Sequence, residues 1–197
     1  FSLVIPAIQA DLKYLDRLRA SIEAQTLEPD EIIYVISGVD KCPEISDWIV
    51  VCFSDRLKAG SARNAGWKRS RSEIVSFFDA DDIMYPERTE VILRHFDQMQ
   101  MVLHEFSTVS LKDHNMNMSP AYDDDIVYDS MIRTEGKQLH LHTEMTHGHV
   151  SIRRNVNCDP FVDDWAEDSI FVRACVKRLG RRVERFIRHP LSLYVPR

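Results

Sequence analysis

The sequence predicts a single α/β domain in which a mixed, mainly parallel sheet is flanked by helices. Apolar runs of strand length alternate with amphipathic stretches of helical period through the first half of the chain. This alternation is typical of a doubly wound sheet, whose ligands bind at the carboxyl ends of the parallel strands. The length of 197 residues corresponds to about one domain.

The first strands and helices can be placed from residue type. Pro6 stops the first apolar run, and Pro29 with Asp30 breaks the chain before a second run that is too apolar to be half-exposed. Asp11 is expected to cap the first helix and Pro86 to open the third. The predicted strands are residues 2–5, 32–36, 48–53 and 74–78, and the predicted helices are residues 12–22, 61–70 and the stretch after Pro86.

The second half is less regular, but nothing in it indicates a second domain. We expect one strand within residues 99–110, further strands at 150–152 and 182–187, and a helix at 168–179. Residues 1–98 and 99–197 are therefore interpreted as two halves of one domain, the first of them a nucleotide-binding half.

Composition excludes several classes of protein. With 25 Lys and Arg against 31 Asp and Glu, the formal net charge is −6, which argues against a nucleic-acid binder that neutralises phosphates with a basic face. No apolar run approaches the ~20 residues of a transmembrane helix, so we expect no membrane span.

The four cysteines, Cys42, Cys52, Cys158 and Cys175, form no CxxC pair, so a zinc or redox site built on cysteine is not predicted. Nothing in the sequence resembles a secretion signal. We therefore expect four free thiols in a reducing, cytoplasmic compartment. The chain begins at Phe1, and we expect it to be part of a longer protein whose flanks could hold further domains.

Three carboxylates, Asp79, Asp81 and Asp82, follow the fourth predicted strand within four residues. Carboxylates this close repel one another unless a cation neutralises them. Hard divalent ions such as Mg²⁺ or Mn²⁺ prefer oxygen ligands and are often shared with substrate phosphates. A cation site is one interpretation of this strand end, and an acidic turn that caps the next helix is the other.

A basic segment, residues 56–66, precedes this acidic strand end. Gly60 permits close approach to the backbone and Ser61 can cap the helix, so the helix N-terminus with its Arg and Lys neighbours suits a diphosphate. The segment is neither a Walker A nor a GxGxxG motif, which argues against a P-loop ATPase or a Rossmann dehydrogenase. A solvated basic loop is the alternative.

Four short motifs follow one another along the chain: residues 3–7, residues 59–66, residues 78–82 and the Ala-Glu-Asp at 166–168. Their order and spacing resemble those of the family 2 glycosyltransferases, which have the GT-A (Rossmann-like) fold. Each motif is weak alone, whereas the four in this order are specific. The compact length is also similar to that of a chlorovirus member of the family that glycosylates capsid protein, which would make this a viral protein.

The resemblance implies a role for each matching position. The donor-binding residues would be Pro6, Ala7, Gln9, Asp40, Arg56, Lys58, Gly60, Arg63, Asn64, Asp79, Ala80 and Asp81. Among them, Asp79 would reach the ribose or donor sugar, and Asp81 would hold the metal that bridges the diphosphate. His189 would be a late metal ligand, with a surface histidine as the alternative. Asp168 would be the general base of an inverting transfer.

The implied function is a metal-dependent, inverting transfer of a sugar from a nucleoside diphosphate, UDP by resemblance, to a hydroxyl of a glycan or glycoprotein. A metal and basic residues would neutralise the leaving diphosphate while a carboxylate takes the proton of the attacking hydroxyl. Residues 1–98 would bind the donor, and residues 99–197 would supply the acceptor site and the base. The usual Asn after the first strand is Gln9 here, and Asp40 alone stands for the acidic residues that bind uracil.

Two other classes share parts of this pattern. A nucleotidyltransferase would carry a glycine-rich signature after the first strand, where this chain has Pro6 and Ala7. A non-catalytic sugar-nucleotide-binding domain would not need both Asp81 and Asp168.

Two further features remain open. Trp165 is able to stack on a sugar face, although tryptophan more often belongs to the core. Four histidines, His140, His142, His147 and His149, form two i, i+2 pairs. They are expected to line the donor or acceptor site rather than to bind zinc, because no cysteine or third ligand accompanies either pair.

Overall fold

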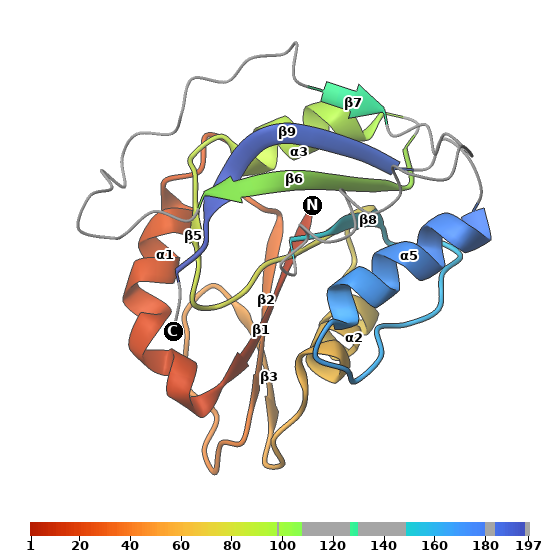
Figure 1. Cartoon of the computed structure of the whole chain (residues 1–197). Helices are drawn as coiled ribbons and strands as arrows, with labels where there is room; N and C mark the ends of the chain where they lie inside the picture. Colours follow the sequence, from red (N-terminus) through yellow and green to blue (C-terminus); the bar gives the residue numbers. More distant parts are fainter. Residues whose placement is uncertain (98, 108–126, 130–148, 180–183, 196–197) are drawn as a thin grey trace.

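The computed structural model describes residues 1–97, 99–107, 127–129, 149–179 and 184–195. Within them, nine strands form one mixed sheet (Figure 1), which confirms the predicted α/β class. Strands β3, β2, β1 and β4 are parallel neighbours in that order, and antiparallel β8 connects them to β6, β9 and β5, while β7 pairs with β9. The strands are β1 Ser2–Ile8, β2 Glu31–Ser37, β3 Ile49–Phe53, β4 Ile74–Phe77, β5 Ile83–Met84, β6 Met101–Ser107, β7 Val127–Asp129, β8 Ser151–Arg153 and β9 Glu184–Leu193.

Helices cover both faces of this sheet. They are the 3-10 helix η1 Gln9–Tyr14 and the α-helices α1 Leu15–Glu23, α2 Ala59–Arg69, α3 Arg88–Phe96 and α5 Glu167–Leu179. Helix α1 lies on one side, and α2 and α5 lie on the other (Figure 1). Because side chains alternate along a strand, Val4 packs with Ala62 and Phe171 under α2 and α5, whereas Leu3 packs with Leu18 of α1. None of the described helices is long and apolar enough to cross a bilayer.

Strand β1 continues to Ile8, three residues beyond the predicted end. Proline within a strand removes one hydrogen-bond donor from the ladder, which usually confines it to edges. β1 pairs with β4 only from Ser2 to Val4, so Pro6 lies where β4 has already left the sheet. β1 therefore accommodates Pro6 although it is a central strand. Beyond Val4, its edge on the side of the acidic residues is not paired with β4.

The first predicted helix is divided, and the predicted cap at its start is wrong. Asp11 is buried within η1, where its Oδ2 accepts a hydrogen bond from the amide of Ile8 at 3.0 Å. The N-cap position of α1 is Tyr14. Asp11 thus fixes the exit of β1 rather than the start of α1.

The cysteines are paired, so the prediction of four free thiols is wrong. Cys42 is bonded to Cys52, and Cys158 is bonded to Cys175. The Cα atoms of the two pairs are 5.7 and 5.1 Å apart, within the usual range for disulfides. Neither pair forms a motif in the sequence, since only folding brings the partners together. The predicted cytoplasmic location rested on free thiols and stays a prediction without that support.

We expect the unreduced, denatured protein to show no reaction with a thiol reagent and the reduced protein to show four thiols. Replacing both Cys158 and Cys175 with serine should lower the free energy of unfolding by about 3 kcal/mol, because the bond closes a loop of this length in the unfolded chain. Urea unfolding with and without reductant measures this loss. Reactive thiols in the unreduced protein would contradict the pairing.

Candidate functional site

An acidic turn, residues 79–82, follows β4 at the edge where the parallel strands end. The amide of Asp82 donates to the carbonyl of Asp79 at 3.3 Å and closes the turn. The side chain of Asp79 is 29% exposed, whereas that of Asp82 is 1% exposed, and Asp81 is buried. Asp79 is therefore the carboxylate of this turn most open to a ligand.

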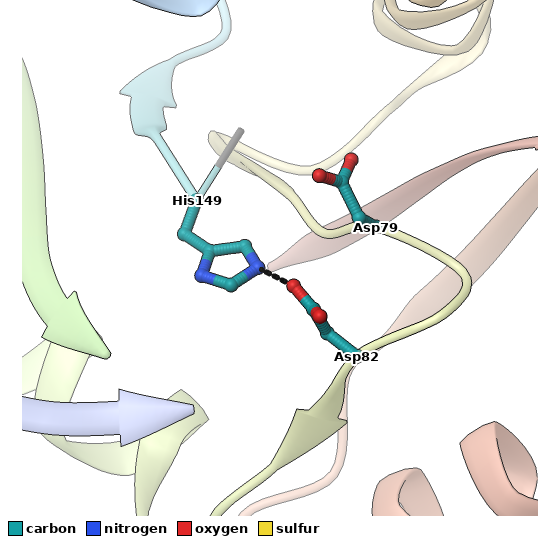
Figure 2. A group of neighbouring side chains, drawn as sticks. All are labelled: Asp79, Asp82 and His149. Atoms are coloured by element: carbon teal, nitrogen blue, oxygen red, sulfur yellow. Dashed lines mark ion pairs between the residues drawn. The ribbon is translucent and has the colours of Figure 1, made fainter. Parts of the chain in front are cut away.

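Both carboxylate oxygens of Asp82 are engaged. Oδ1 accepts a hydrogen bond from the amide of Val195 at 3.0 Å, and Oδ2 lies 2.9 Å from Nε2 of His149 (Figure 2). Nδ1 of His149 lies 2.8 Å from Oγ of Ser192, and its ring stacks on Phe78 with the centroids 4.7 Å apart. His149 is 1% exposed. It therefore braces the turn against β9 and, contrary to the prediction, does not line an open site. The other three histidines of that cluster lie outside the described residues.

A buried cation, Arg88 at the start of α3, lies beneath the same turn. Its Nη2 donates to Oγ of Ser76 at 3.0 Å and to the carbonyl of Phe77 at 3.2 Å. Its Nε donates to Nε2 of His104 at 3.2 Å. Burial lowers the pKa of Arg88 to about 9, against the opposing effect of Asp82. Arg88 thus fixes the end of β4, from which the acidic turn departs.

Arg63 of α2 connects the acidic turn to α5. Its Nη2 donates to Oδ1 of Asp79 at 2.6 Å, and its Nη1 donates to Oε1 of Glu167. Burial alone would lower the pKa of Arg63, but Asp79 and Glu167 raise it. The side chain is 2% exposed and paired with two carboxylates, so the predicted contact of Arg63 with a diphosphate is not supported by the described geometry.

The electrostatics of the turn are dominated by burial, and like charges add to its effect. Burial raises the pKa of Asp79 to about 6, and Asp82 and Asp81 add to the rise, while Arg63 and His149 oppose it. One donor atom from each of Asp79, Asp82 and His149 lies within 4.8 Å of the others. Carboxylate oxygens are the ligands of hard cations, so the turn fits a divalent cation that would relieve this repulsion.

Helix α5 begins at Glu167 and brings Asp168 to the same edge of the sheet. Both acids lie in the first turn of the helix, where the helix dipole stabilises negative charge. Asp168 is half-buried, and its Oδ1 accepts a hydrogen bond from the amide of Ser169 at 2.7 Å. Since Arg63 ties Glu167 to Asp79 and is also influenced by the charge of Asp168, the predicted base lies close to the acidic turn.

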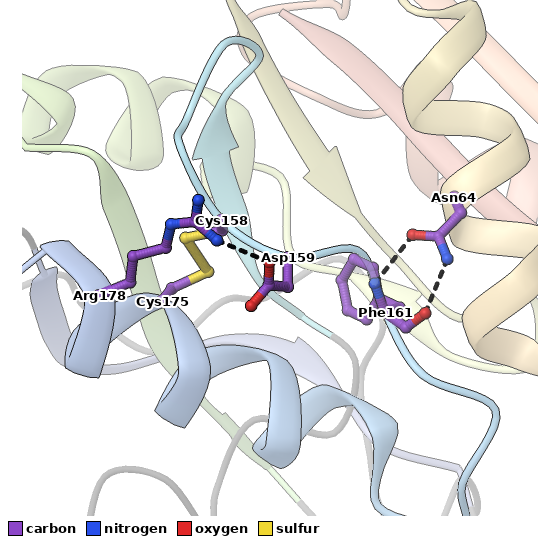
Figure 3. Close-up of a disulfide and its surroundings, with 6 residues drawn as sticks. All are labelled: Asn64, Cys158, Asp159, Phe161, Cys175 and Arg178. Carbon is purple, nitrogen blue, oxygen red and sulfur yellow. Dashed lines mark hydrogen bonds and ion pairs between the residues drawn. A yellow bond between two sulfur atoms is a disulfide. The ribbon is translucent and has the colours of Figure 1, made fainter.

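The basic segment of α2 packs against the residues that precede α5, which we call the α5 approach (residues 158–166). The amide and Oγ of Ser61 donate to the carboxylate of Asp163 at 2.9 and 2.7 Å. Nζ of Lys58 donates to the carbonyl of Asp163 at 3.1 Å. The side chain of Asn64 exchanges two hydrogen bonds with the backbone of Phe161, at 2.8 and 2.9 Å (Figure 3).

Gly60 provides the space for this packing. A Cβ atom at Gly60 would lie 2.1 Å from the carbonyl oxygen of Val162, so the close approach that its glycine permits is to the chain's own backbone. Lys58, Gly60 and Asn64 therefore hold the α5 approach in place, and their predicted contacts with a nucleotide stay predictions.

The remaining predicted donor residues lie at the same edge of the sheet. Pro6 and Ala7 are buried at the end of β1, and Gln9 is exposed in η1. Asp40 follows β2 and Arg56 follows β3, and both are exposed. Parallel strands carry their carboxyl ends to one edge, which places these positions on the side of the acidic turn; Ala80 belongs to that turn and is buried.

Some residues of this site were not predicted. Glu167 stands in the Ala-Glu-Asp motif, so the motif itself was a signal for it, whereas Arg88 has no local signal beyond following Pro86. His189 lies in β9, but its side chain is outside the part of the chain that the structure describes, so its predicted metal role stays a prediction.

A parallel sheet that ends at an acidic turn, beside a helix whose first turn supplies a carboxylate, is the arrangement that the resemblance to glycosyltransferases of GT-A fold implies. The comparison with protein families agrees. The model described as Glycosyl transferase family 2 matches residues 2–158, and the chain belongs to that family.

Relatives of known name or structure are similar to parts of this chain. The amylovoran biosynthesis glycosyltransferase AmsE of Erwinia amylovora is 27% identical over 110 residues, which are 51% of this chain and 41% of AmsE. S. aureus TarS 1–349, solved with UDP-GlcNAc, has a TM-score of 0.67 at 13% identity, with 100% of this chain and 58% of that chain covered. Glucosyl-3-phosphoglycerate synthase of Mycobacterium tuberculosis has a TM-score of 0.69 at 18% identity, with 100% and 70% covered.

Because the sequence identities to these two solved structures are low, the structural likeness shows the fold alone. The chain matches about two fifths of AmsE. These relatives are bacterial, and they give no support to the narrower resemblance to a chlorovirus enzyme.

Proposed function

We propose that this chain is a metal-dependent, inverting glycosyltransferase that moves a sugar from UDP to a hydroxyl of a glycan or glycoprotein. The observation that carries the proposal is the pairing of Arg63 with both Asp79 and Glu167. It holds a candidate cation site and a candidate base, Asp168, at one edge of the sheet. Family membership argues against the alternative of a nucleotidyltransferase.

The donor half of the proposal rests on the acidic turn. Asp79, Asp82 and His149 offer one set of ligands, but Asp82 is buried and committed to His149 and Val195. We therefore assign the divalent cation to Asp79 and Asp81, the pair that the strand-end motif implies. When bound, Mn²⁺ or Mg²⁺ neutralises the charge that develops on the leaving diphosphate. The choice of UDP is supported by TarS, solved with UDP-GlcNAc, and by the mycobacterial synthase, solved with Mn²⁺ and UDP.

The acceptor half rests on Asp168. A carboxylate at a helix N-terminus stays ionised and is able to take the proton of an attacking hydroxyl. Attack from the face opposite the diphosphate displaces it in one step and inverts the anomeric carbon. No covalent intermediate with the protein is needed, and no nucleophile is assigned.

Asp81→Asn is expected to weaken Mn²⁺-dependent binding of UDP by at least about 100-fold, because a neutral amide is a poor ligand for a hard cation. Isothermal titration calorimetry of UDP with and without Mn²⁺ measures this effect. The melting temperature should change little, since the substitution is nearly isosteric.

Asp82→Asn is the matched control. It removes a charge from the buried pair with His149, so it should lower the free energy of unfolding by about 1–3 kcal/mol and leave Mn²⁺-dependent binding largely intact. The reverse pattern, with Asp82→Asn losing the metal and Asp81→Asn keeping it, would place the cation on Asp82 and His149 and contradict the assignment.

A further inference from the structure

Trp165, in the α5 approach, leaves 94% of its surface in water. Burial of an aromatic side chain removes about 150–250 Å² of surface from water. Leaving Trp165 exposed therefore gives up the stabilisation that burial of its indole would bring. The other two tryptophans have packing partners. The ring of Trp48 lies 5.8 Å from that of Tyr34, and the ring of Trp67 lies 5.8 Å from that of Phe171.

Exposed apolar side chains are concentrated near Trp165 in the sequence. In the described part of the chain, four large apolar side chains are exposed, and three of them lie within nine residues: Val162 at 44%, Trp165 at 94% and Ile170 at 36%. The fourth, Leu27, is 43% exposed and lies after α1. Scattered single residues of this kind are normal, whereas three within nine residues, one of them an almost fully exposed indole, favour a role in binding a ligand.

The backbone that carries Trp165 is held firmly. Oδ1 of Asp164 accepts hydrogen bonds from the amides of Trp165 and Ala166, at 2.7 and 3.4 Å. The bonds of Asp163 to Ser61 anchor the residues just before it.

The far end of the α5 approach is anchored as well. Cys158 is bonded to Cys175 of α5, and Asp159 pairs with Arg178 at 2.6 Å (Figure 3). The indole is therefore presented by an ordered frame, and a ligand that stacks on it would have little backbone to order.

The surroundings of Trp165 select among ligands by charge. Four carboxylates lie within six residues: Asp163, Asp164, Glu167 and Asp168. Glu167 is paired with Arg63, so the carboxylates that would repel an anionic acceptor are those of Asp163, Asp164 and Asp168. A neutral sugar ring has an apolar face of C–H groups, which suits the negative face of an aromatic ring, and hydroxyls at its edge, one of which the proposed reaction needs next to Asp168.

We propose that Trp165 is the platform on which a neutral sugar ring of the acceptor stacks, so that the acceptor is a neutral glycan or a protein that carries one. The inference rests on the proposed function for the identity of the reacting hydroxyl. Trp165 binds the ring, and Asp168, three residues further along the chain, takes the proton.

The test uses the whole chain with UDP and Mn²⁺ and a panel of neutral disaccharides, matched uronic-acid disaccharides and a lysine-rich peptide. Acrylamide quenching of tryptophan fluorescence reports on the indole directly, without any need for turnover. At least one neutral disaccharide should protect the parent protein from quenching, and this protection should be absent in Trp165→Ala. For that disaccharide, Trp165→Ala should raise the acceptor KM or Kd about tenfold, while Trp165→Phe should retain most of the affinity.

Leu27→Ala is the matched control, because Leu27 is an exposed apolar side chain outside the site. It should leave acceptor affinity unchanged, and all the variants should bind UDP like the parent. Protection by the uronic acids or the peptide and not by the neutral sugars, or by none of the panel, would overturn the proposal. A parent protein that fails to bind UDP with Mn²⁺ but is protected by a neutral disaccharide would contradict the proposed function and leave the platform standing.

Discussion

Asp168→Asn is expected to lower kcat by about 10²–10⁴-fold, the range for loss of a general base, while the affinity for UDP stays unchanged. Asparagine has nearly the same shape, so the hydrogen bond that Oδ1 accepts from the amide of Ser169 can persist. What disappears is the capacity to accept a proton. Steady-state kinetics with calorimetry of UDP binding separates the two effects.

Asp164→Asn provides the control for the electrostatics of the same helix end. Asp164 accepts hydrogen bonds from two amides just before α5, so its replacement should cost about 1 kcal/mol of stability or less and change kcat only a few-fold. If Asp168→Asn behaved in the same way, Asp168 would be an acid of the first turn and not the base. An NMR spectrum of the product that showed a retained anomeric configuration would contradict the inverting mechanism independently.

The parallel part of the sheet could be predicted because strands buried on both faces leave uninterrupted apolar runs in the sequence. Residues 32–36 and 74–78 are of this kind, and the strands observed there differ by a residue at most at each end. β5 and β7 were not predicted, since strands of two and three residues have too few side chains to show a period. The prediction ended β1 at Pro6 because proline usually ends a strand. In the fold, β4 stops pairing with β1 before Pro6, so the missing amide proton costs no hydrogen bond to β4 and β1 continues to Ile8.

The acidic half of the site was recognisable because Asp79 and Asp81 are close in sequence and Asp168 belongs to a motif. Arg63 was predicted as a site residue as well, but as a contact of the donor and not as the partner of Asp79 and Glu167. Arg63 and Glu167 are separated by 104 residues, and a basic residue in a basic segment is typical of a solvated surface. His149 resembled one member of a histidine-rich stretch, whereas its partner Asp82 resembled a metal ligand. Only the folded chain shows that these two residues are buried together.

Replacing Arg63 with methionine is expected to lower the free energy of unfolding by up to about 3–5 kcal/mol, because it leaves the buried Glu167 and the partly exposed Asp79 without their shared cation. Methionine retains much of the apolar stem, so the loss reports on charge. Arg63→Lys should fall between, since one ammonium group cannot donate to both carboxylates in the geometry of the guanidinium fork. Urea unfolding measures both variants.

The loss should also depend on pH. Burial raises the pKa of Asp79 to about 6 even with Arg63 present, and Arg63 opposes the rise, so in Arg63→Met this pKa is expected to be higher still. A carboxyl group whose pKa is raised by folding destabilises the protein increasingly as the pH rises from its unfolded value through its folded value. The stability difference between the parent and Arg63→Met should therefore be smaller at about pH 5 than at about pH 8.

Arg19→Met separates this buried role from the general effect of removing an arginine. Arg19 bonds to Ser46 at the surface and pairs with Glu23 at 3.6 Å, so its loss should cost less than about 1 kcal/mol. If Arg63 instead contacted the diphosphate, Arg63→Met would keep its stability and lose affinity for UDP but not for uridine. Because the structure pairs Arg63 with both the acidic turn and α5, we expect the opposite: a large loss of stability, and a fall in kcat that accompanies the loosened alignment of Asp79 and Asp168.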